Sequence, residues 1–272
     1  MISRKKKIAC APALVNSIIQ GECLEVMKTI PDASIDMILC DLPYGTTSCK
    51  WDSIISLPAL WEHYKRLIKP TGVLVLTSCQ PFTTKLIGSN MDWFKYCWYW
   101  VKNNANGYTD AKNRPMRKVE EVCVFSPAPM THKNKVGEAR MTYNPQGVRV
   151  LGEQISIQRK NGRAAGANGI HAGKVFTAYT GYPNNVLYYD VVVQAKNAES
   201  HPTQKPVGLF DYLIRTYTND EDNALILDNC AGSCTTAIAC INTNRCYICI
   251  EQDPAYVAMG RQRVANATCT ED

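Results

Sequence analysis

The sequence predicts an α/β fold in which a mostly parallel sheet carries helices on both faces. Through most of the chain, short apolar runs typical of strands alternate with segments of helical periodicity. Near the end, a strand at Ala224–Asp228 is followed by a turn containing Gly232 and by a helix at Cys234–Asn242, the layout of half of a nucleoside-binding Rossmann fold. With 272 residues, 46% of them hydrophobic, the chain can bury one large core and carry an appendage.

Strands and helices alternate from Ser17 onward. The apolar run Ile35–Cys40 predicts a buried strand that ends at Asp41. Two later runs, Tyr96–Val101 and Glu121–Phe125, predict an antiparallel pair that closes the sheet. The other elements expected in this half are a strand at Ser17–Gln20, a helix at Cys23–Ile30, a helix at Pro58–Ile68, a strand at Gly72–Ser78 and a helix at Pro81–Gly88.

The last third of the chain repeats the alternation. An apolar stripe predicts a helix that begins near Pro206, and its members are Leu209, Phe210, Leu213, Ile214 and Tyr217. After the strand, turn and helix already described, the run Tyr247–Ile250 predicts a further strand that ends at Glu251. An acidic residue about 20 positions after such a turn is placed to hold the hydroxyls of a ribose.

Asp41-Leu42-Pro43-Tyr44 follows a buried strand and indicates a pocket for a planar amine. A carboxylate can accept hydrogen from an exocyclic NH2 group, Pro43 stiffens the backbone, and Tyr44 can stack on a flat ring. Asp, Pro and Gly are also ordinary turn residues, so these residues alone leave a plain turn open.

Two further segments have the character of ligand-binding loops. In the turn after Asp228, Gly232 would let the backbone approach a ligand, although a single glycine also fits an ordinary α/β crossover. The segment His201–Pro206 leads into a helix, so Lys205 and the free N–H groups of the helix start can face an anion such as a carboxylate. A well-capped helix start would use the same residues.

These three segments together resemble the DNA amino-methyltransferases that modify N6 of adenine or N4 of cytosine. That family has D-P-P-Y where this chain has Asp41-Leu42-Pro43-Tyr44, and its D-x-F-x-G-x-G motif matches Asp228–Cys234. Its H-P-T-Q-K-P segment is intact at His201–Pro206. The order of the three segments is that of the β-class enzymes, and the resemblance spans nearly all of the chain.

The resemblance implies a Rossmann-like methyltransferase fold, with a mostly parallel seven-stranded sheet and a circularly permuted motif order. It also implies S-adenosylmethionine as the cofactor, base flipping, and direct in-line transfer without a covalent enzyme intermediate. Asp41 and the carbonyl of Leu42 would accept the two amino hydrogens, Pro43 would hold the backbone, and Tyr44 would stack on the base. The surplus proton would leave through Asp41 or through water.

The resemblance also assigns the cofactor site. Glu251 would bind the ribose hydroxyls, Lys205 would lie near the methionine carboxylate, and Glu22 is a lesser candidate for the adenine amine. The residues expected near the methionine portion are Asp228, Asn229, Cys230, Ala231, Gly232 and Ser233.

The chain departs from the family pattern at three positions. Cys230 replaces the motif's Phe, which makes one apolar wall of the cofactor pocket smaller, and Cys234 replaces its final Gly. Because Cys234 falls in the first helical turn, it does not need a positive φ on this interpretation. Leu42 replaces a Pro, which matters less because its expected role uses the carbonyl.

We expect methylation of adenine N6, because an acidic first residue in the D-P-P-Y motif is commoner among the adenine enzymes of the family. N4-cytosine methylation is the close alternative. RNA adenine methylation and a catalytically silent DNA-binding module are more remote alternatives. The intact Asp41, Tyr44 and Glu251 argue against the silent module.

Residues 127–199 are predicted to form an inserted target-recognition region between the two parts of a catalytic domain, 1–126 and 200–272. They contain nine Lys or Arg against four acidic residues, which accounts for five of the six net positive charges of the chain. A polyanion, here double-stranded DNA, is the expected partner. The expected DNA contacts are Lys133, Lys135, Arg140, Arg149, Arg159, Lys160, Arg163 and Lys174.

The sequence predicts neither a membrane span nor a metal site. No run approaches the roughly 20 apolar residues of a span. Cys246 and Cys249 have a zinc-like spacing, but residues three apart on a strand point to opposite faces. Many of the 13 cysteines lie in apolar runs, as reduced core thiols of a cytoplasmic protein would. Related enzymes often dimerise, and the sequence leaves both a homodimer and a monomer open. By analogy, a small methylase of this kind suits a bacterial or bacteriophage setting, and the sequence does not say whether it is part of a restriction-modification pair.

Overall fold

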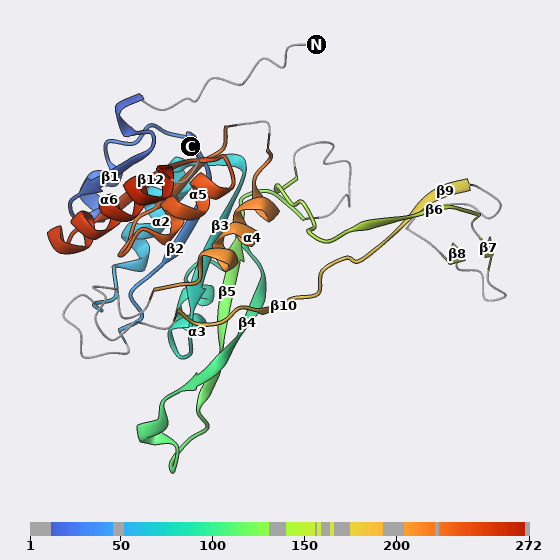
Figure 1. Ribbon diagram of the computed structural model, residues 1–272, viewed down its shortest axis with the longest axis horizontal. Helices are drawn as coiled ribbons and strands as arrows, with labels where there is room; N and C mark the ends of the chain where they lie inside the picture. Colours follow the sequence, from blue (N-terminus) through green and yellow to red (C-terminus); the bar gives the residue numbers. More distant parts are fainter. Residues whose placement is uncertain are drawn as a thin grey trace. The chain divides into compact units, whose positions relative to one another are not determined.

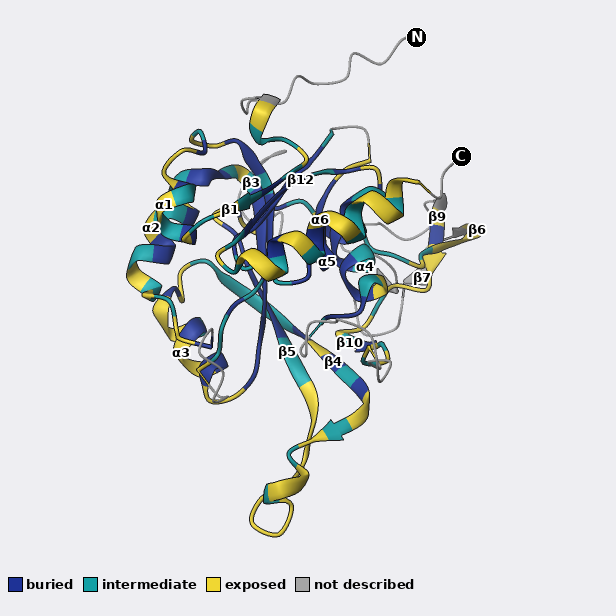
Figure 2. Cartoon of the chain, turned by 60° about the vertical axis from the view of Figure 1, so that its left-hand side comes forward, coloured by how far each residue is buried: buried dark blue, intermediate teal, exposed yellow. Residues whose placement is uncertain are grey.

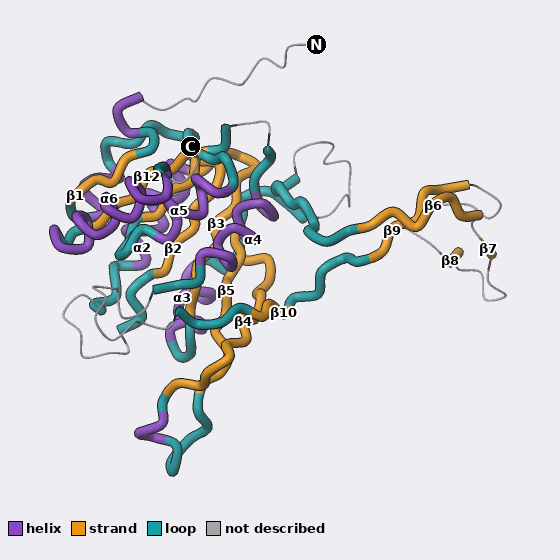
Figure 3. Tube along the Cα trace, viewed as in Figure 1, coloured by secondary structure: helices purple, strands orange, loops and turns teal. Residues whose placement is uncertain are grey.

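A mixed sheet of eight strands organises the larger of the two units into which the chain divides (Figures 1 and 3). The computed structural model describes residues 12–45, 52–130, 140–155, 157–158, 164–165, 175–192, 204–220 and 223–269. Among these, Pro145–Asn184 form the smaller unit and the remaining residues form the larger one. The smaller unit spans fewer residues than the region 127–199, which the sequence predicts to recognise the target.

Seven strands of the sheet are parallel to one another, and β5 runs antiparallel to both of its neighbours. The strand order is β1-β12-β11-β2-β3-β5-β4-β10. Their bounds are β1 Ser17–Gln20, β12 Cys246–Glu251, β11 Leu225–Asp228, β2 Ile35–Asp41, β3 Ile68–Ser78, β5 Arg117–Phe125, β4 Phe94–Asn106 and β10 Val186–Tyr188. The predicted α/β class and mostly parallel sheet are therefore confirmed.

Helices cover both faces of the sheet. One face carries α1 (Cys23–Met27), α2 (Leu57–Leu67) and α3 (Phe82–Ser89), and the other carries α4 (Val207–Tyr217), α5 (Thr235–Asn242) and α6 (Pro254–Thr268). Two short 3-10 helices, Pro12–Leu14 and Tyr108–Asp110, complete the described helical segments.

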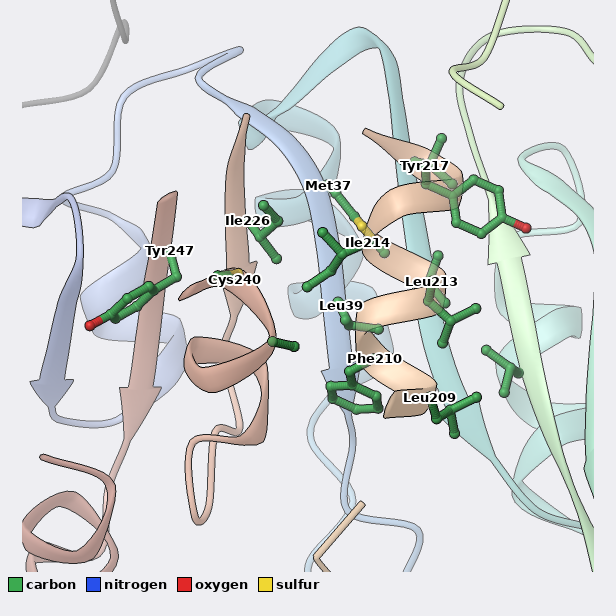
Figure 4. Packing of buried hydrophobic residues seen from close by; sticks show 14 of the residues in the cluster. Met37, Leu39, Leu209, Phe210, Leu213, Ile214, Tyr217, Ile226, Cys240 and Tyr247 are labelled. Carbon is green, nitrogen blue, oxygen red and sulfur yellow. The ribbon is translucent and has the colours of Figure 1, made fainter. Parts of the chain in front are cut away.

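Successive residues of β2 point to opposite faces, which is why this strand is apolar throughout. Met37 and Leu39 pack with the α4 side, whereas Ile38 and Cys40 pack with the α2 side. Figure 4 shows Met37 and Leu39 against Ile214 and Phe210 of α4. The whole stripe predicted for this helix is buried, and each such side chain stabilises the fold by about 1.5–3 kcal/mol.

The structure corrects several predicted boundaries. The predicted helix from Cys23 ends at Met27, and β3 begins at Ile68, where a helix end was predicted. Strands β4 and β5 extend well beyond Tyr96–Val101 and Glu121–Phe125, and together they form a hairpin whose far end is exposed (Figure 2). Polar residues form this extension, so the apolar alternation that marks a strand is missing there.

Strands also occur where none was predicted. The three-residue β10 lies beside β4 and is the eighth strand of a sheet expected to have seven. A strand of three residues is too short to show an alternation of apolar and polar side chains. In the smaller unit, β6 (Arg149–Ile155) pairs antiparallel with β9 (Val175–Thr180). A second small pair joins β7 (Ile157–Gln158) and β8 (Ala164–Ala165).

None of the helices in the described part of the chain combines the length and apolar character that crossing a bilayer requires.

The backbone conformation of Cys234 also differs from the prediction. The residue lies just before α5 in the left-handed region, with φ +59°, which the sequence interpretation considered unnecessary. The position therefore keeps the backbone that the family's final Gly adopts easily, at a cost of about 1–2 kcal/mol for a residue with a Cβ. The Cys234 side chain is fully buried against Gly260 of α6.

This contact generates a stability prediction. A Cβ at Gly260 would overlap the Cys234 thiol, so Gly260→Ala should lower the free energy of unfolding by about 1–3 kcal/mol in a urea titration. Gly88→Ala is the matched control, because a Cβ at Gly88 of α3 meets nothing within 4 Å. The double variant Gly260→Ala/Cys234→Gly should recover part of the loss. Equal stabilities of Gly260→Ala and Gly88→Ala would contradict this packing.

Candidate active site

The candidate site is a cavity of about 680 Å³ at the carboxyl ends of the central parallel strands. Strands β11 and β2 are neighbours, but the chain leaves β11 toward β12 and leaves β2 toward β3. This change of winding direction opens a crevice, which is where ligands bind in open α/β sheets. Every catalytic and cofactor residue expected from the sequence lines the cavity: Glu22, Asp41, Leu42, Pro43, Tyr44, Lys205, Asp228, Asn229, Cys230, Ala231, Gly232, Ser233 and Glu251.

Asp41 ends β2 with its carboxylate held on three sides. One oxygen, Oδ1, accepts hydrogen bonds from the Tyr44 hydroxyl at 2.7 Å and from the Thr77 hydroxyl. The other, Oδ2, accepts from Lys205 Nζ at 2.6 Å. A carboxylate oxygen has about two acceptor positions, so Oδ1 is saturated and Oδ2 keeps one position for a further donor.

Lys205 links the H-P-T-Q-K-P segment to Asp41 of the D-L-P-Y segment. Its ammonium lies 2.6 Å from Asp41 Oδ2 and 3.7 Å from Glu120 Oε2, and only 8% of its side chain is exposed. Burial works against its charge, but Asp41 and Glu120 outweigh burial and raise the pKa of Lys205. The ammonium therefore stays charged, and it lies 5.6 Å from the centre of the Tyr44 ring.

Tyr44 is fixed in place by its neighbours. Its ring stacks on Phe82 at 5.6 Å between ring centres, and its hydroxyl bridges Asp41 and Thr77. Burial, together with the negative charges of Asp41 and Glu120, raises the pKa of Tyr44 well above its usual value. The hydroxyl therefore remains a donor to Asp41. Stacking of the ring on a base stays a prediction.

The β11–α5 turn and the end of β12 form the other half of the cavity. Gly232 has φ +49°, and its N–H donates to Glu251 Oε2 at 2.8 Å, while Asp253 N–H donates to Oε1 at 2.9 Å. Both oxygens of Glu251 are thus oriented by the backbone and each keeps an acceptor position. Glu22 caps α1 by accepting from Glu25 N–H, so its carboxylate is fixed at the same edge.

Asp228 ends β11, directly before the turn, and is almost fully buried. Thr236 Oγ1 donates to its Oδ2 at 2.5 Å, and Cys230 N–H donates to its Oδ1 at 3.1 Å. Burial, which outweighs these hydrogen bonds, raises the pKa of Asp228 to about 7. Asp228 therefore holds the shape of the turn and carries a proton below neutral pH.

Two of the eight expected DNA contacts lie within the described residues. Arg140 and Arg149 are exposed. The other six, namely Lys133, Lys135, Arg159, Lys160, Arg163 and Lys174, lie outside the described residues, as do His201, Pro202 and Thr203 of the H-P-T-Q-K-P segment. Their assignment stays a prediction.

Comparison with known proteins places the chain in a family. Residues 35–262, most of the chain, match the family model described as DNA methylase, of the N6/N4 type. The chain belongs to this N6/N4 DNA methylase family. The resemblance drawn from the three motifs is thereby confirmed.

Similar proteins are bacterial DNA methyltransferases by name. The type II methyltransferase M.HpaI of Haemophilus parainfluenzae is 24% identical over 261 residues, which cover 91% of this chain and 73% of that protein. M.HinfI of Haemophilus influenzae is 24% identical over 280 residues, covering 92% and 68% of the two chains. The DNA adenine methyltransferase YhdJ of Escherichia coli is 26% identical over 263 residues, covering 91% and 82%.

Solved structures show the same fold. The PvuII DNA methyltransferase, described as cytosine-N4-specific, superposes with a TM-score of 0.62 at 15% identity and covers 92% of this chain and 90% of its own. The complex of M1.HpyAVI with SAM, S-adenosylmethionine, gives a TM-score of 0.57 at 20% identity and covers 91% and 98%. The names include an adenine enzyme and a cytosine enzyme, so these similarities set the class of methylase and leave the target base open.

Sequence reasoning missed several residues of this methylase site. Glu120 and Lys102 line the cavity and pair with each other, with Lys102 Nζ 2.8 Å from Glu120 Oε1. Thr77 donates a hydrogen bond to the Asp41 carboxylate, and Arg117 lines the cavity from the β4–β5 hairpin. A polar residue at the end of a predicted strand was the available signal for Thr77, whereas Lys102, Arg117 and Glu120 lie on strand extensions that were not predicted.

The described residues contain no group of three His, Cys, Asp or Glu side chains arranged as metal ligands. Cys246 packs on the α2 face of the sheet and Cys249 on the α4 face, as their spacing on one strand requires. Of the four thiols expected in the core, Cys40, Cys123 and Cys240 are buried, whereas Cys97 is half-buried; all four are free.

The buried carboxyl of Asp228 generates a pH prediction. Its pKa is about 7 in the folded protein against an ordinary value of 3.8, so the folded state binds the proton more tightly than the unfolded chain. Its contribution to stability is complete below pH 3.8 and is lost as the pH rises through about 7. Asp228→Asn should remove this loss, so that its urea stability relative to the wild type rises between pH 5 and about 8.

Asp92→Asn is the control for this measurement, because Asp92 is an exposed carboxylate outside the cavity. A wild-type and an Asp228→Asn stability profile that run parallel across this pH range would show that Asp228 is already ionised at low pH.

Proposed function

We propose that this protein transfers the methyl group of S-adenosylmethionine to the exocyclic N6 of an adenine that is flipped out of double-stranded DNA. The observation that carries the proposal is Asp41 Oδ2, the one oxygen of the carboxylate with an acceptor position left, in a cavity that also contains the cofactor turn. A carboxylate so placed accepts an amino hydrogen of the base and turns the nitrogen lone pair toward the methyl donor.

The cofactor residues fit a nucleoside with a charged methionine tail. Glu251 presents two oriented oxygens to a ribose diol, and Gly232 leaves the turn without a side chain at the point of closest approach. The sulfonium of the bound cofactor supplies a reactive methyl group. Lys205, which the resemblance assigned to the methionine carboxylate, contacts Asp41, so we assign it to the base side of the cavity.

The chain's own contribution to the reaction is alignment. Thr77 and Tyr44 fix the Asp41 carboxylate, the carbonyl of Leu42 is proposed as the acceptor of the second amino hydrogen, and Tyr44 offers a ring to the base. Holding two reactants in line contributes several kcal/mol to lowering the barrier. The negative charge of Asp41 also stabilises positive charge that develops on the nitrogen, and its carboxylate or water takes the released proton.

Cytosine N4 is the second candidate, since Asp41 Oδ2 would accept hydrogen from that amine equally well. The acidic first residue of the D-L-P-Y segment supports adenine. No covalent attachment to either base is needed, because the exocyclic nitrogen is itself the nucleophile.

DNA is the proposed partner, and two exposed basic surfaces support it. One is the predicted recognition region, where Arg140 and Arg149 are exposed. The other is the far end of the β4–β5 hairpin, where four cations face solvent: Lys112, Arg114, Arg117 and Lys118. Tyr108 at the tip is 83% exposed, and an exposed ring beside cations is typical of nucleic-acid surfaces. Because Arg117 also lines the cavity, this hairpin connects the DNA surface to the active site.

In the direct test, the protein is incubated with methyl-labelled S-adenosylmethionine and unmethylated duplex DNA. The DNA is then digested to nucleosides, which are separated by chromatography with mass detection. We expect the label in N6-methyladenine. Label in N4-methylcytosine would overturn the choice of base, and absence of label despite cofactor binding by calorimetry would overturn DNA as the substrate.

Asp41→Ala should reduce methyl transfer by at least about a hundredfold and leave the calorimetric affinity for S-adenosylmethionine within about twofold. The reason is that Asp41 contacts the base amine, whereas the cofactor turn keeps its own hydrogen bonds. Asp32→Ala is the control, since this exposed carboxylate pairs with Arg66 outside the cavity. Equal loss of transfer and of cofactor binding would mean that Asp41 mainly shapes the cofactor pocket.

Replacing Lys112, Arg114 and Lys118 together by Ala should weaken binding to DNA of any sequence. If each cation contacts one phosphate, the slope of log K against log salt should become shallower by about 2–3. Replacing Arg159, Lys160 and Arg163 tests the recognition region in the same way. Lys65→Ala is the control, because Lys65 lies at the end of α2, away from the strand ends that bear the site. A slope equal to that of the wild type would remove the substituted segment from the DNA surface.

A further inference from the structure

Three charged groups from different parts of the chain, the carboxylate of Asp41 among them, form a row in which each group contacts the next. Asp41 Oδ2 is a hydrogen-bond acceptor, Lys205 Nζ is a donor 2.6 Å away, and Glu120 Oε2 is a second acceptor 3.7 Å beyond Lys205. All three residues line the cavity. The row therefore presents the pattern acceptor, donor, acceptor to whatever enters.

The register of the sheet explains why Glu120 belongs to this row. Asp41 pairs with Thr77, and Thr77 pairs with Val122, so Glu120 lies two residues further along β5 on the same face of the sheet. On β4, Trp100 is the direct partner of Glu120. Glu121, in contrast, points to the α3 side, where Thr83 Oγ1 donates to it at 3.1 Å.

The two oxygens of Glu120 differ. Oε1 accepts from Lys102 Nζ at 2.8 Å, and the Lys102 side chain is only 3% exposed. Oε2 is buried and has no hydrogen-bond partner among the residues that the structure describes. Buried carboxylate oxygens in folded proteins normally have donors, and the nearest cation to Oε2, Lys205 Nζ, lies 3.7 Å away, so this oxygen keeps acceptor capacity for a ligand that reaches Glu120.

We propose that Asp41, Lys205 and Glu120 together bind the Watson–Crick edge of the flipped base, and that Glu120 makes the site prefer adenine to cytosine. This inference rests on the proposed function. It assigns Lys205 as a base-binding residue and Glu120 as a specificity-determining residue.

The pattern first selects bases with an amino group. Adenine has N6–H as donor beside N1 as acceptor, and cytosine has N4–H beside N3, so both complement Asp41 Oδ2 and Lys205 Nζ. Guanine and thymine present a carbonyl beside a ring N–H, which is the reverse order. Enzymes that act on flipped bases select them by hydrogen bonds to this edge.

The third position separates the two amino bases. Next to N1, adenine has C2–H, whose weakly positive hydrogen can face a carboxylate oxygen. Next to N3, cytosine has the O2 carbonyl, and two acceptors would then face each other without water. An unpaired polar group of this kind lowers affinity by roughly ten- to a hundredfold. Glu120 therefore favours adenine by disfavouring cytosine.

Glu120 also preserves the charge of Asp41. Lys205 alone would neutralise the carboxylate that stabilises positive charge on the reacting nitrogen. Lys205 pairs with both Asp41 and Glu120, and Lys102 pairs with Glu120, so the two carboxylates and two ammoniums together have no net charge. Because Lys205 also faces Glu120, it cancels only part of the negative charge of Asp41. Loss of the Glu120 charge should thus also slow transfer to adenine.

The test compares duplexes in which the mapped target position holds adenine, cytosine or 2,6-diaminopurine. In Glu120→Gln, the amide oxygen should stay with Lys102, so the NH2 group replaces the orphaned oxygen and can donate to cytosine O2. We expect the adenine-to-cytosine ratio of kcat/KM to fall by about tenfold or more relative to the wild type. The wild type should also prefer diaminopurine, whose 2-amino group can donate to Glu120, over adenine, and Glu120→Gln should lose this preference.

Glu121→Gln is the matched control and should keep both wild-type ratios. Unchanged ratios in Glu120→Gln, whatever its absolute rate, would overturn the inference while the proposed function stands. If Glu120→Gln does not fold, the wild-type comparison decides, because an enzyme that favours adenine over diaminopurine contradicts a free acceptor at this position. A wild type that methylates none of the duplexes would instead overturn the proposed function.

Discussion

The ion pair between Asp41 and Lys205 is the interaction on which the site depends. The two residues are 164 positions apart in the chain, and their side chains meet at 2.6 Å beside the cofactor turn. Burying an ammonium and a carboxylate is costly unless further partners satisfy them. Thr77 and Tyr44 supply those partners for Asp41, and Glu120 supplies a second counter-charge for Lys205. The pair therefore joins the D-L-P-Y segment, the H-P-T-Q-K-P segment and the β4–β5 hairpin into one site.

The sheet makes this meeting possible. Met37 and Leu39 bury one face of β2 under α4, and Ile38 and Cys40 bury the other, so the strand end that carries Asp41 has no freedom to shift. The α4 helix starts two residues after Lys205, at Val207, and packs its whole apolar stripe on the same face. Packing of apolar residues thus sets the positions of charged groups that would not come together on their own.

Local signals predicted a large part of this arrangement. Asp41, Tyr44 and Glu251 were predictable because each follows an apolar strand, and the carboxyl ends of parallel strands share one edge of a sheet. The contact of Lys205 was not predictable, because a motif fixes the order of residues and not their partners. Glu120 was hidden for another reason: Val119-Glu120-Glu121-Val122 gives no sign of which acid faces the cavity until the register of β5 is known. The positive φ of Cys234 was missed because a cysteine at a helix start carries no signal for it.

The most direct test of the account is a crystal structure of the protein with S-adenosylhomocysteine and a duplex that contains the mapped target adenine. We expect N6 of the flipped base on Asp41 Oδ2 and N1 within about 2.7–3.2 Å of Lys205 Nζ, with Glu120 facing C2. A flipped base whose amine lies away from Oδ2, or a Lys205 ammonium withdrawn from the base edge, would contradict it.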